Sequence, residues 1–203
     1  MPRFYVDFAL IPDSVVELPD NVVRHLNVLR VKNTEEIVLF NGNGKAYPAL
    51  PEVLEKRRAS VRILREEATD NESPLNITLV QAVSAAERMD FTLQKSVELG
   101  VAEIRPVISE RCVVRLSGER AEKRVARWQE IVVSACEQSG RNIVPKVLPL
   151  TTYAQALQQL PQETTKLLMS LNRAQKLSDV QPQSGKVVFM VGPRSEERRV
   201  GKE

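Results

Sequence analysis

Cysteine, histidine and aromatic residues are scarce in this chain of 203 residues, which holds two cysteines and one histidine. Two cysteines are too few for a disulfide scaffold, and a single histidine makes a zinc site of Cys and His ligands unexpected. We therefore expect no bound metal. Aromatic residues make up 4% of the chain against 42% for all hydrophobic residues, so its cores must be mainly aliphatic.

Long apolar segments are missing as well. No stretch reaches 18 apolar residues, and no apolar run follows a basic N-terminus. We therefore expect a soluble, cytoplasmic protein without membrane contact. The length suffices for one large domain or two small ones.

Net charge is low, because 29 basic residues face 26 acidic ones and leave a formal charge of +3. This small net charge alone is poor support for nucleic-acid binding, but the charged residues are unevenly distributed along the chain. Residues 1–72 carry 10 Lys and Arg against 12 Asp and Glu, whereas residues 73–193 carry 15 against 11. The basic excess therefore lies in the second part of the chain.

Residues 1–70 read as a small β domain of short strands and turns. Asn41–Gly44 is a tight-turn signal, because Gly and Asn accept positive φ. A helix is predicted over Val22–Val31, with Asp20 or Asn21 as its cap. The polar segment Ala68–Pro74 predicts a linker. The strands expected here are Phe4–Val6, Glu36–Phe40, Lys45–Leu50 and Ala59–Leu64.

Residues 75–193 alternate between strands and helices, which predicts an α/β domain with a doubly wound, mostly parallel sheet. One helix should start at a capping box of Ser84 and Glu87 and end at Gly100, and a second box of Thr152 and Gln155 should open a short helix. The long amphipathic helix is expected over Ser117–Gly140. Buried strands are expected at Asn76–Val83, Glu103–Ser109, Lys146–Leu148, Lys166–Ser170 and Lys186–Val191.

Three strand ends are candidates for a ligand site, since ligands of open α/β sheets bind beyond the carboxyl ends of the strands. They are Val83-Ser84, Met169–Asn172 and Val191–Pro193, the last leaving its strand through a Gly that lets backbone approach a ligand. No G-x-G-x-x-G or P-loop motif follows any strand, so a dinucleotide site is unsupported.

Four segments together resemble one known family. They are Pro2–Phe4, the run HLNVLR at His25–Arg30, QKSVELGV at Gln94–Val101 and ACEQSGRN at Ala135–Asn142. The resemblance covers residues 2–193 and is to the ribosomal RNA small subunit methyltransferase E (RsmE) family of the SPOUT superfamily. Members of that family methylate N3 of a uridine in 16S rRNA of the assembled small ribosomal subunit.

The resemblance implies a PUA-like RNA-binding β domain over residues 1–70 and a SPOUT methyltransferase domain over residues 75–193. S-adenosylmethionine would be the cofactor, bent into a trefoil knot, and the SPOUT domains would form a homodimer. Asn33-Thr34 departs from the usual family Gly, which affects only a turn. The catalytic base is not identified. The resemblance implies Gly192 and Pro193 at the cofactor, Arg3, His25, Arg30 and Arg111 at the RNA, and Glu98, Gln138, Arg141 and Asn142 as catalytic candidates. The strand-end argument adds Met169, Ser170 and Leu171 to the cofactor site, and the basic residues add Arg115 to the RNA site.

The last ten residues, 194–203, do not continue the family pattern. They read RSEERRVGKE, with seven charges and one apolar side chain, directly after a buried strand. The string resembles the translation of a sequencing adapter, so we expect a non-native tail. On this reading the knot is incomplete, and the chain as given should bind S-adenosylmethionine weakly and be inactive.

Two other functions stay open at this point. One is a non-catalytic rRNA-binding or ribosome-assembly protein on the same scaffold. The other is a nucleotide-dependent oxidoreductase, although Ser84–Arg88 supplies no Gly-rich first turn. Some of these residues could have a structural role instead of a functional one. His25 could be a core histidine, and the basic residues between 111 and 127 could form a solvated helix face. Arg111 and Arg115 fit phosphate contacts better, since they flank an apolar strand end.

Overall fold

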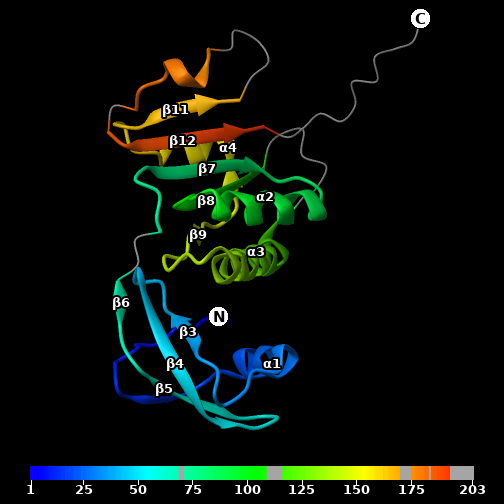
Figure 1. The fold of residues 1–203 in the computed structure, drawn as a ribbon. Coiled ribbons are helices and arrows are strands. Elements are labelled where there is room, and N and C mark those ends of the chain that lie inside the picture. Colours follow the sequence, from blue (N-terminus) through cyan, green and yellow to red (C-terminus); the bar gives the residue numbers. More distant parts are fainter. Residues whose placement is uncertain (69–70, 109–115, 170–174, 183, 193–203) are drawn as a thin grey trace, which may run out of the picture. The chain divides into compact units, whose positions relative to one another are not determined.

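The computed structural model describes residues 1–68, 71–108, 116–169, 175–182 and 184–192. These residues form two compact units (Figure 1). The first unit consists of residues 1–72 and 133–144, and the second of residues 73–132 and those from 145 on. The first unit is therefore discontinuous in the sequence.

The first unit is built on a mixed sheet of six strands. The strand order is β1-β3-β4-β5-β2, with β6 paired to β4; β1 runs parallel to β3 and the other pairs are antiparallel. The sheet was expected, although two of its short strands were not. The strands are β1 (Arg3–Tyr5), β2 (Val15–Glu17), β3 (Ile37–Phe40), β4 (Lys45–Leu54), β5 (Ala59–Ile63) and β6 (Glu67–Ala68).

Helix α1 (Asp20–Leu29) packs its apolar side on this sheet. Val22, Val23 and Leu26 are buried at helical spacing in one core with the strand residues. The predicted cap at Asp20 or Asn21 is wrong. Pro19 is the N-cap, and its side chain has no acceptor that could bond to an amide of the first turn.

The second unit is a parallel sheet with the strand order β10-β8-β7-β12-β11, and β9 pairs with β8. The predicted parallel sheet is confirmed. Strand β11 was expected to be buried and is not, because it is an edge strand whose residues are half-buried or exposed. The strands are β7 (Asn76–Ala82), β8 (Glu103–Ile108), β9 (Lys146–Val147), β10 (Thr151–Thr152), β11 (Thr165–Leu168) and β12 (Lys186–Val191).

Helix α2 (Ala86–Glu98) buries Met89, Leu93 and Val97, the row that the sequence predicts. The chain leaves it through Gly100, whose φ of +93° suits a residue without a side chain. The capping box of Ser84 and Glu87 is wrong: Ala85 is the N-cap and no side chain caps the helix. The helix begins too late in the sequence for Ser84 to reach the required amide.

Helix α3 (Gly118–Ser139) contributes to both units, with the boundary between Val132 and Val133. Helix α4 (Tyr153–Gln158) starts with the predicted box of Thr152 and Gln155, which is confirmed. A short 3-10 helix η1 follows at Leu177–Asp179. None of the helices among the described residues is long and apolar enough to cross a membrane.

Candidate functional site

The carboxyl ends of β7, β12 and β11 lie at one edge of the second unit's sheet. β12 stands between the other two, and all three strands are parallel. Val191 pairs with Gln81 on one side, and Leu168 pairs with Met190 on the other. The fold therefore brings together the three strand ends singled out in the sequence, at the edge where ligands of such sheets bind.

Two residues of the predicted cofactor site are described at this edge. The Met169 amide donates to the Met190 carbonyl at 3.1 Å and continues the pairing of β11 with β12, while its side chain is 66% exposed. Gly192 is exposed, and a Cβ placed on it would meet no atom of the described residues within 4 Å. The edge thus offers an exposed apolar side chain and open backbone, both of which suit a flat heterocyclic ligand. Ser170, Leu171 and Pro193 lie outside the described residues.

A second group of predicted site residues gathers in the first unit, around the segment after α3. Arg3 donates through Nη2 to the Asn142 side-chain oxygen, and its guanidinium lies 5.3 Å from the Phe40 ring centroid. Asn142 is 2% exposed. Two buried donors here, Arg3 Nε and Asn142 Nδ2, have no hydrogen-bond partner within the described part of the chain.

Glu137 and His25 belong to the same group. The Tyr5 amide donates to Glu137 Oε1 at 3.0 Å, which ties α3 to β1. Burial raises the pKa of Glu137, while the Tyr5 hydrogen bond and the His25 charge act in the opposite direction. The His25 ring meets Phe4 edge-on at 5.2 Å.

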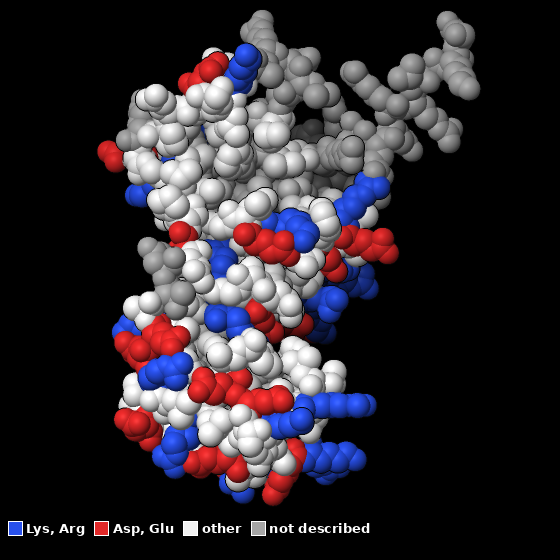
Figure 2. All heavy atoms as spheres, in the orientation of Figure 1, with Lys and Arg blue, Asp and Glu red and all other residues white. Residues whose placement is uncertain are grey.

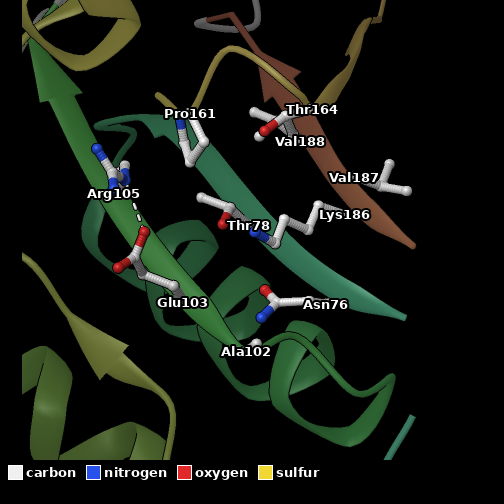
Figure 3. Close-up of a pocket in the computed structure, with 10 residues that line it drawn as sticks. All are labelled: Asn76, Thr78, Ala102, Glu103, Arg105, Pro161, Thr164, Lys186, Val187 and Val188. Carbon is white, nitrogen blue, oxygen red and sulfur yellow. Dashed lines mark hydrogen bonds and ion pairs between the residues drawn. The ribbon is translucent and has the colours of Figure 1, made fainter. Parts of the chain in front are cut away.

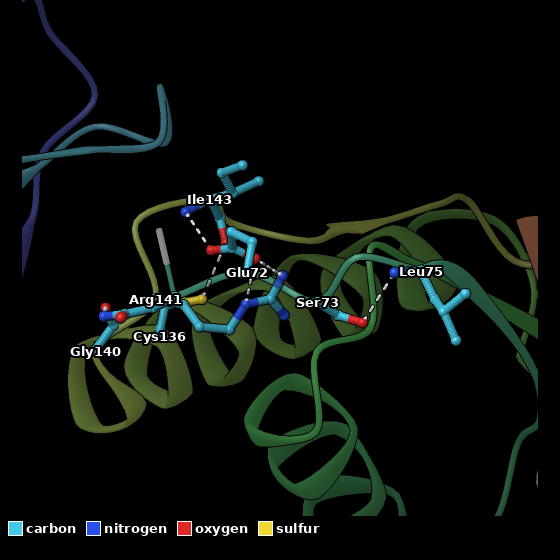
Figure 4. Close-up of polar contacts among 8 residues, drawn as sticks. Glu72, Ser73, Leu75, Cys136, Gly140, Arg141 and Ile143 are labelled. Atoms are coloured by element: carbon cyan, nitrogen blue, oxygen red, sulfur yellow. Dashed lines mark hydrogen bonds and ion pairs between the residues drawn. The ribbon is translucent and has the colours of Figure 1, made fainter. Parts of the chain in front are cut away.

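Arg141 is held by a partner that the sequence did not suggest. Its Nε donates to Glu72 Oε2 at 2.9 Å, and the Ile143 amide donates to Glu72 Oε1 at 3.3 Å. Figure 4 shows the Glu72 carboxylate between these two groups. The Arg141 side chain is only 6% exposed. Nothing local in the sequence marks Glu72, since it sits in a polar segment that reads as a linker.

The four catalytic candidates do not fall in one unit. Glu98 lies on α2 in the second unit and pairs with Lys95 at 2.8 Å. Gln138, Arg141 and Asn142 lie in the first unit, where Gln138 is exposed and the other two are buried. The contacts of Arg141 and Asn142 supply these residues with a structural role, and their catalytic assignment stays a prediction.

Around α1, the first unit has two hollows that share Val23 in their lining, and together we call them the α1 groove. One, of about 450 Å³, is lined by Asp20, Val23, Arg24, Lys56 and Arg57. The other, of about 330 Å³, includes Arg30 and Glu55. Figure 2 shows basic side chains projecting where Figure 1 places α1 and the β4–β5 turn. Of the predicted RNA-binding residues, Arg30 lies here, whereas Arg111 and Arg115 fall outside the described residues.

Comparison with known proteins identifies the family. A family described as "RNA methyltransferase domain" matches residues 71–195, and one described as "RNA methyltransferase PUA domain" matches residues 18–64. The crystal structure of a ribosomal RNA small subunit methyltransferase E from Neisseria gonorrhoeae, bound to S-adenosyl methionine, is 66% identical. It covers 95% of this chain and 80% of its own, with a TM-score of 0.91. The chain belongs to the ribosomal RNA small subunit methyltransferase E family.

Two further similar proteins share a lower sequence identity with the chain. A methyltransferase structure from Legionella pneumophila in complex with bound SAM is 36% identical, with a TM-score of 0.88 over 95% of this chain and 79% of its own. A methyltransferase E from Buchnera aphidicola is 35% identical over 72% of this chain. The chain spans 60% and 61% of the lengths of this and a second Buchnera relative.

Family membership confirms the predicted fold class. The first unit contains the PUA-like domain, and the second carries the parallel sheet of a SPOUT methyltransferase fold. Within the described ranges, no group of three or more His, Cys, Asp or Glu side chains is placed to hold a metal ion.

Proposed function

We propose that this protein uses S-adenosylmethionine to methylate N3 of a uridine in 16S rRNA of the assembled small ribosomal subunit. The observation that carries the proposal is the 66% identity, over 95% of the chain, to a methyltransferase E bound to S-adenosyl methionine. The open carboxyl edge of β7, β12 and β11 supports it independently, since a parallel sheet binds its ligand at that edge.

The cofactor would lie at this edge, held by Met169 and Gly192 together with Ser170, Leu171 and Pro193. The exposed Met169 side chain suits a face of the adenine ring, because a thioether packs well against aromatic groups. Gly192 leaves room for the cofactor to approach the backbone. When bound, S-adenosylmethionine supplies an activated methyl group on a sulfonium leaving group. The chain's own contribution is to align that methyl with the uridine and to exclude water.

The α1 groove would contact the phosphate backbone of the RNA. Four cations line it, Arg24, Arg30, Lys56 and Arg57, against the two acids Asp20 and Glu55. Such a patch binds polynucleotides through charge and without base specificity. Arg3 and His25 would act indirectly: Arg3 holds Asn142, and His25 of α1 packs on Phe4 of β1. Arg111 and Arg115 would add further contacts, and a homodimer formed through the second unit is the proposed assembly.

Methyl transfer to isolated small subunits tests the proposal. The substrate is small subunits from cells that lack the modification, and nuclease digestion followed by mass spectrometry identifies the methylated nucleoside. The assay compares the 203-residue chain with residues 1–193 continued by the C-terminal segment of the Neisseria relative. N3-methyluridine in 16S rRNA is the expected product. Binding of small subunits without any binding of S-adenosylmethionine by the continued chain would instead support a non-catalytic rRNA-binding protein.

Two matched variants test the RNA surface. Arg30→Gln removes a cation of the α1 groove, and Arg58→Gln removes a neighbouring cation that is already paired with Glu17. Arg30→Gln should weaken binding to small subunits several-fold and reduce its salt dependence, whereas Arg58→Gln should not. Equal effects of the two variants would contradict the assignment of the α1 groove.

A further inference from the structure

On one face of the second unit's sheet, three neighbouring strands change from polar to apolar side chains along their length: Lys186 to Val188 on β12, Thr78 to Val80 on β7 and Arg105 to Val107 on β8. The register pairs Asn76 with Lys186 and Thr78 with both Glu103 and Val188, so the polar side chains lie together near the amino ends. Further along the same face the strands carry apolar residues, which form one core with α4. These are Val80, Ala82, Val107, Val188 and Met190.

Helix α4 is too short to cover this whole face. Its six residues span about 9 Å, and Ala156 and the following Leu160 pack on the apolar half of the strands. Beside the polar half, the chain instead leaves a cavity of about 340 Å³ bordered by Pro161 and Thr164. Figure 3 shows Arg105 and Glu103 on β8, and the Lys186 side chain running from β12 toward Thr78 on β7.

Two hydrogen-bond donors on residues that line this cavity are buried and have no partner. They are Arg105 Nη1 and the Thr164 hydroxyl, as far as the described residues show. Arg105 is held in place because its Nε donates to Glu103 Oε1 at 2.6 Å, and its side chain is only 14% exposed. Buried donors without acceptors are costly and uncommon, so these two point to an acceptor that the polypeptide does not supply.

The charge of the lining identifies the kind of acceptor. Two cations, Arg105 and Lys186, face the single carboxylate of Glu103, which is already bonded to Arg105. Donors also come from several directions, since Arg105, Lys186 and Thr164 stand on three different segments. That arrangement suits a tetrahedral oxyanion better than a planar carboxylate.

We propose that this cavity binds a small phosphate-bearing molecule, with Arg105, Lys186 and Thr164 donating hydrogen bonds to the phosphate oxygens. The cavity lies at the amino ends of the strands, the opposite edge from that of the proposed methyl donor. It is therefore a second site, and it does not depend on the proposed methyl transfer.

Titration of the 203-residue chain with inorganic phosphate, followed by amide NMR at constant ionic strength, tests this proposal. Saturable shifts confined to residues around Thr78, Arg105, Thr164 and Lys186 are expected, with chloride at equal ionic strength giving none. Shifts that grow linearly without saturation, or that spread over the whole surface, would overturn the proposal.

A pair of charge-matched variants sharpens the test. Lys186→Gln removes a cation of the cavity, and Lys166→Gln removes an exposed cation on the adjacent strand β11 that does not line it. Lys186→Gln should weaken phosphate binding about tenfold, Thr164→Val should weaken it several-fold, and Lys166→Gln should leave it within about twofold. Equal weakening by the two lysine variants would mean a general charge effect and would overturn the proposal.

A last arm of the test separates the two sources of phosphate. A nucleoside monophosphate and a short single-stranded RNA are titrated in turn, at equal phosphate concentration. The monophosphate should produce the same localised shifts and lose affinity in Lys186→Gln. If only the RNA binds there, the cavity is part of the RNA path and the small-molecule assignment fails.

Discussion

Glu72 holds the segment after α3, at Arg141 and Ile143, in the first unit. Its carboxylate accepts hydrogen bonds from Arg141 and from the Ile143 amide, and so joins the segment after α3 to the segment after β6. The Arg141 side chain is 6% exposed and that of Glu72 is 19% exposed. An ion pair in this position costs far more to break than a surface pair, because one charge would be left buried.

The substitution Glu72→Gln should therefore lower the free energy of unfolding of the first unit by about 3 kcal/mol. Native-state hydrogen exchange of the β4 and β5 amides reports on this unit directly. The matched control is Glu17→Gln, which breaks the exposed pair with Arg58 and should leave the exchange rates unchanged. Equal effects of the two substitutions would show that the Glu72 pair behaves as a surface contact.

Glu137 gives the first unit a pH dependence of predictable sign. Burial raises the pKa of its carboxyl in the folded state, so the folded protein holds this proton to higher pH than the unfolded chain does. Stability from this group is therefore present below the unfolded pKa and falls as pH rises to the folded pKa. The Tyr5 hydrogen bond and the His25 charge reduce the shift without reversing it.

In Glu137→Gln that pH dependence should disappear, because the amide is neutral throughout and can still accept from the Tyr5 amide. Urea unfolding of the variant and of the parent chain from pH 4 to pH 7 measures the pH dependence of the free energy of unfolding. The stability of the variant relative to the parent chain should increase with pH across the window above the ordinary glutamate pKa. A relative stability that decreases with pH would mean that the carboxylate form is favoured in the fold.

At the scale of elements, two helix starts that look alike in sequence differ in structure. Thr152 and Gln155 form a capping box at α4, whereas Ser84 and Glu87 form none at α2. Thr152→Ala should cost about 1 kcal/mol of stability, the usual worth of such a cap. Ser84→Ala should cost little, and urea unfolding of the two variants gives the comparison. A larger loss in Ser84→Ala would indicate a role for that hydroxyl outside helix capping.

The same comparison shows what the sequence can predict. Rows such as Met89, Leu93 and Val97 have the period of a helix, and all three are buried as predicted. The short strands β2 and β6, of three and two residues, carry no period and were missed. The Ser84 box failed because capping depends on the first helical residue, which tertiary packing moved to Ala86.

The candidate site was predictable in part, for the same reason. The alternation of strands and helices predicts a parallel sheet, which is confirmed, and in such a sheet the carboxyl ends of the strands lie at one edge. The partners of Arg3 and Arg141 were not predictable. Asn142 and Glu72 are separated from them by 139 and 69 positions, and no local pattern marks such pairs.

At the scale of the whole molecule, the first unit is completed by residues from far along the chain. Residues 133–144 group with residues 1–72 and contribute the partners of Arg3, Tyr5 and Glu72. A fragment of residues 1–72 should therefore melt at a lower temperature than the same unit in the intact chain. The β1 amides should also exchange faster, because β1 loses both of its contacts with that segment.

Joining residues 133–144 to this fragment through a flexible glycine-serine linker should restore much of the lost protection. Hydrogen exchange of the two fragments, beside the intact chain, is the measurement. Equal protection of β1 in the shorter fragment and in the intact chain would show that the segment adds nothing to the stability of the unit.

Because α3 contributes residues to both units, the two units cannot be completed one after the other during translation. The residues that close the first unit follow Glu72 by up to 72 positions, and the first part of the second unit is made in between. At roughly 5–20 residues per second, several seconds pass between translation of Glu72 and translation of Val144. During that interval the nascent chain carries a sheet with the Arg3 and Glu72 side chains unpaired. The N-terminal unit therefore cannot be completed until residues 73–132 of the second unit and its own residues 133–144 have been made.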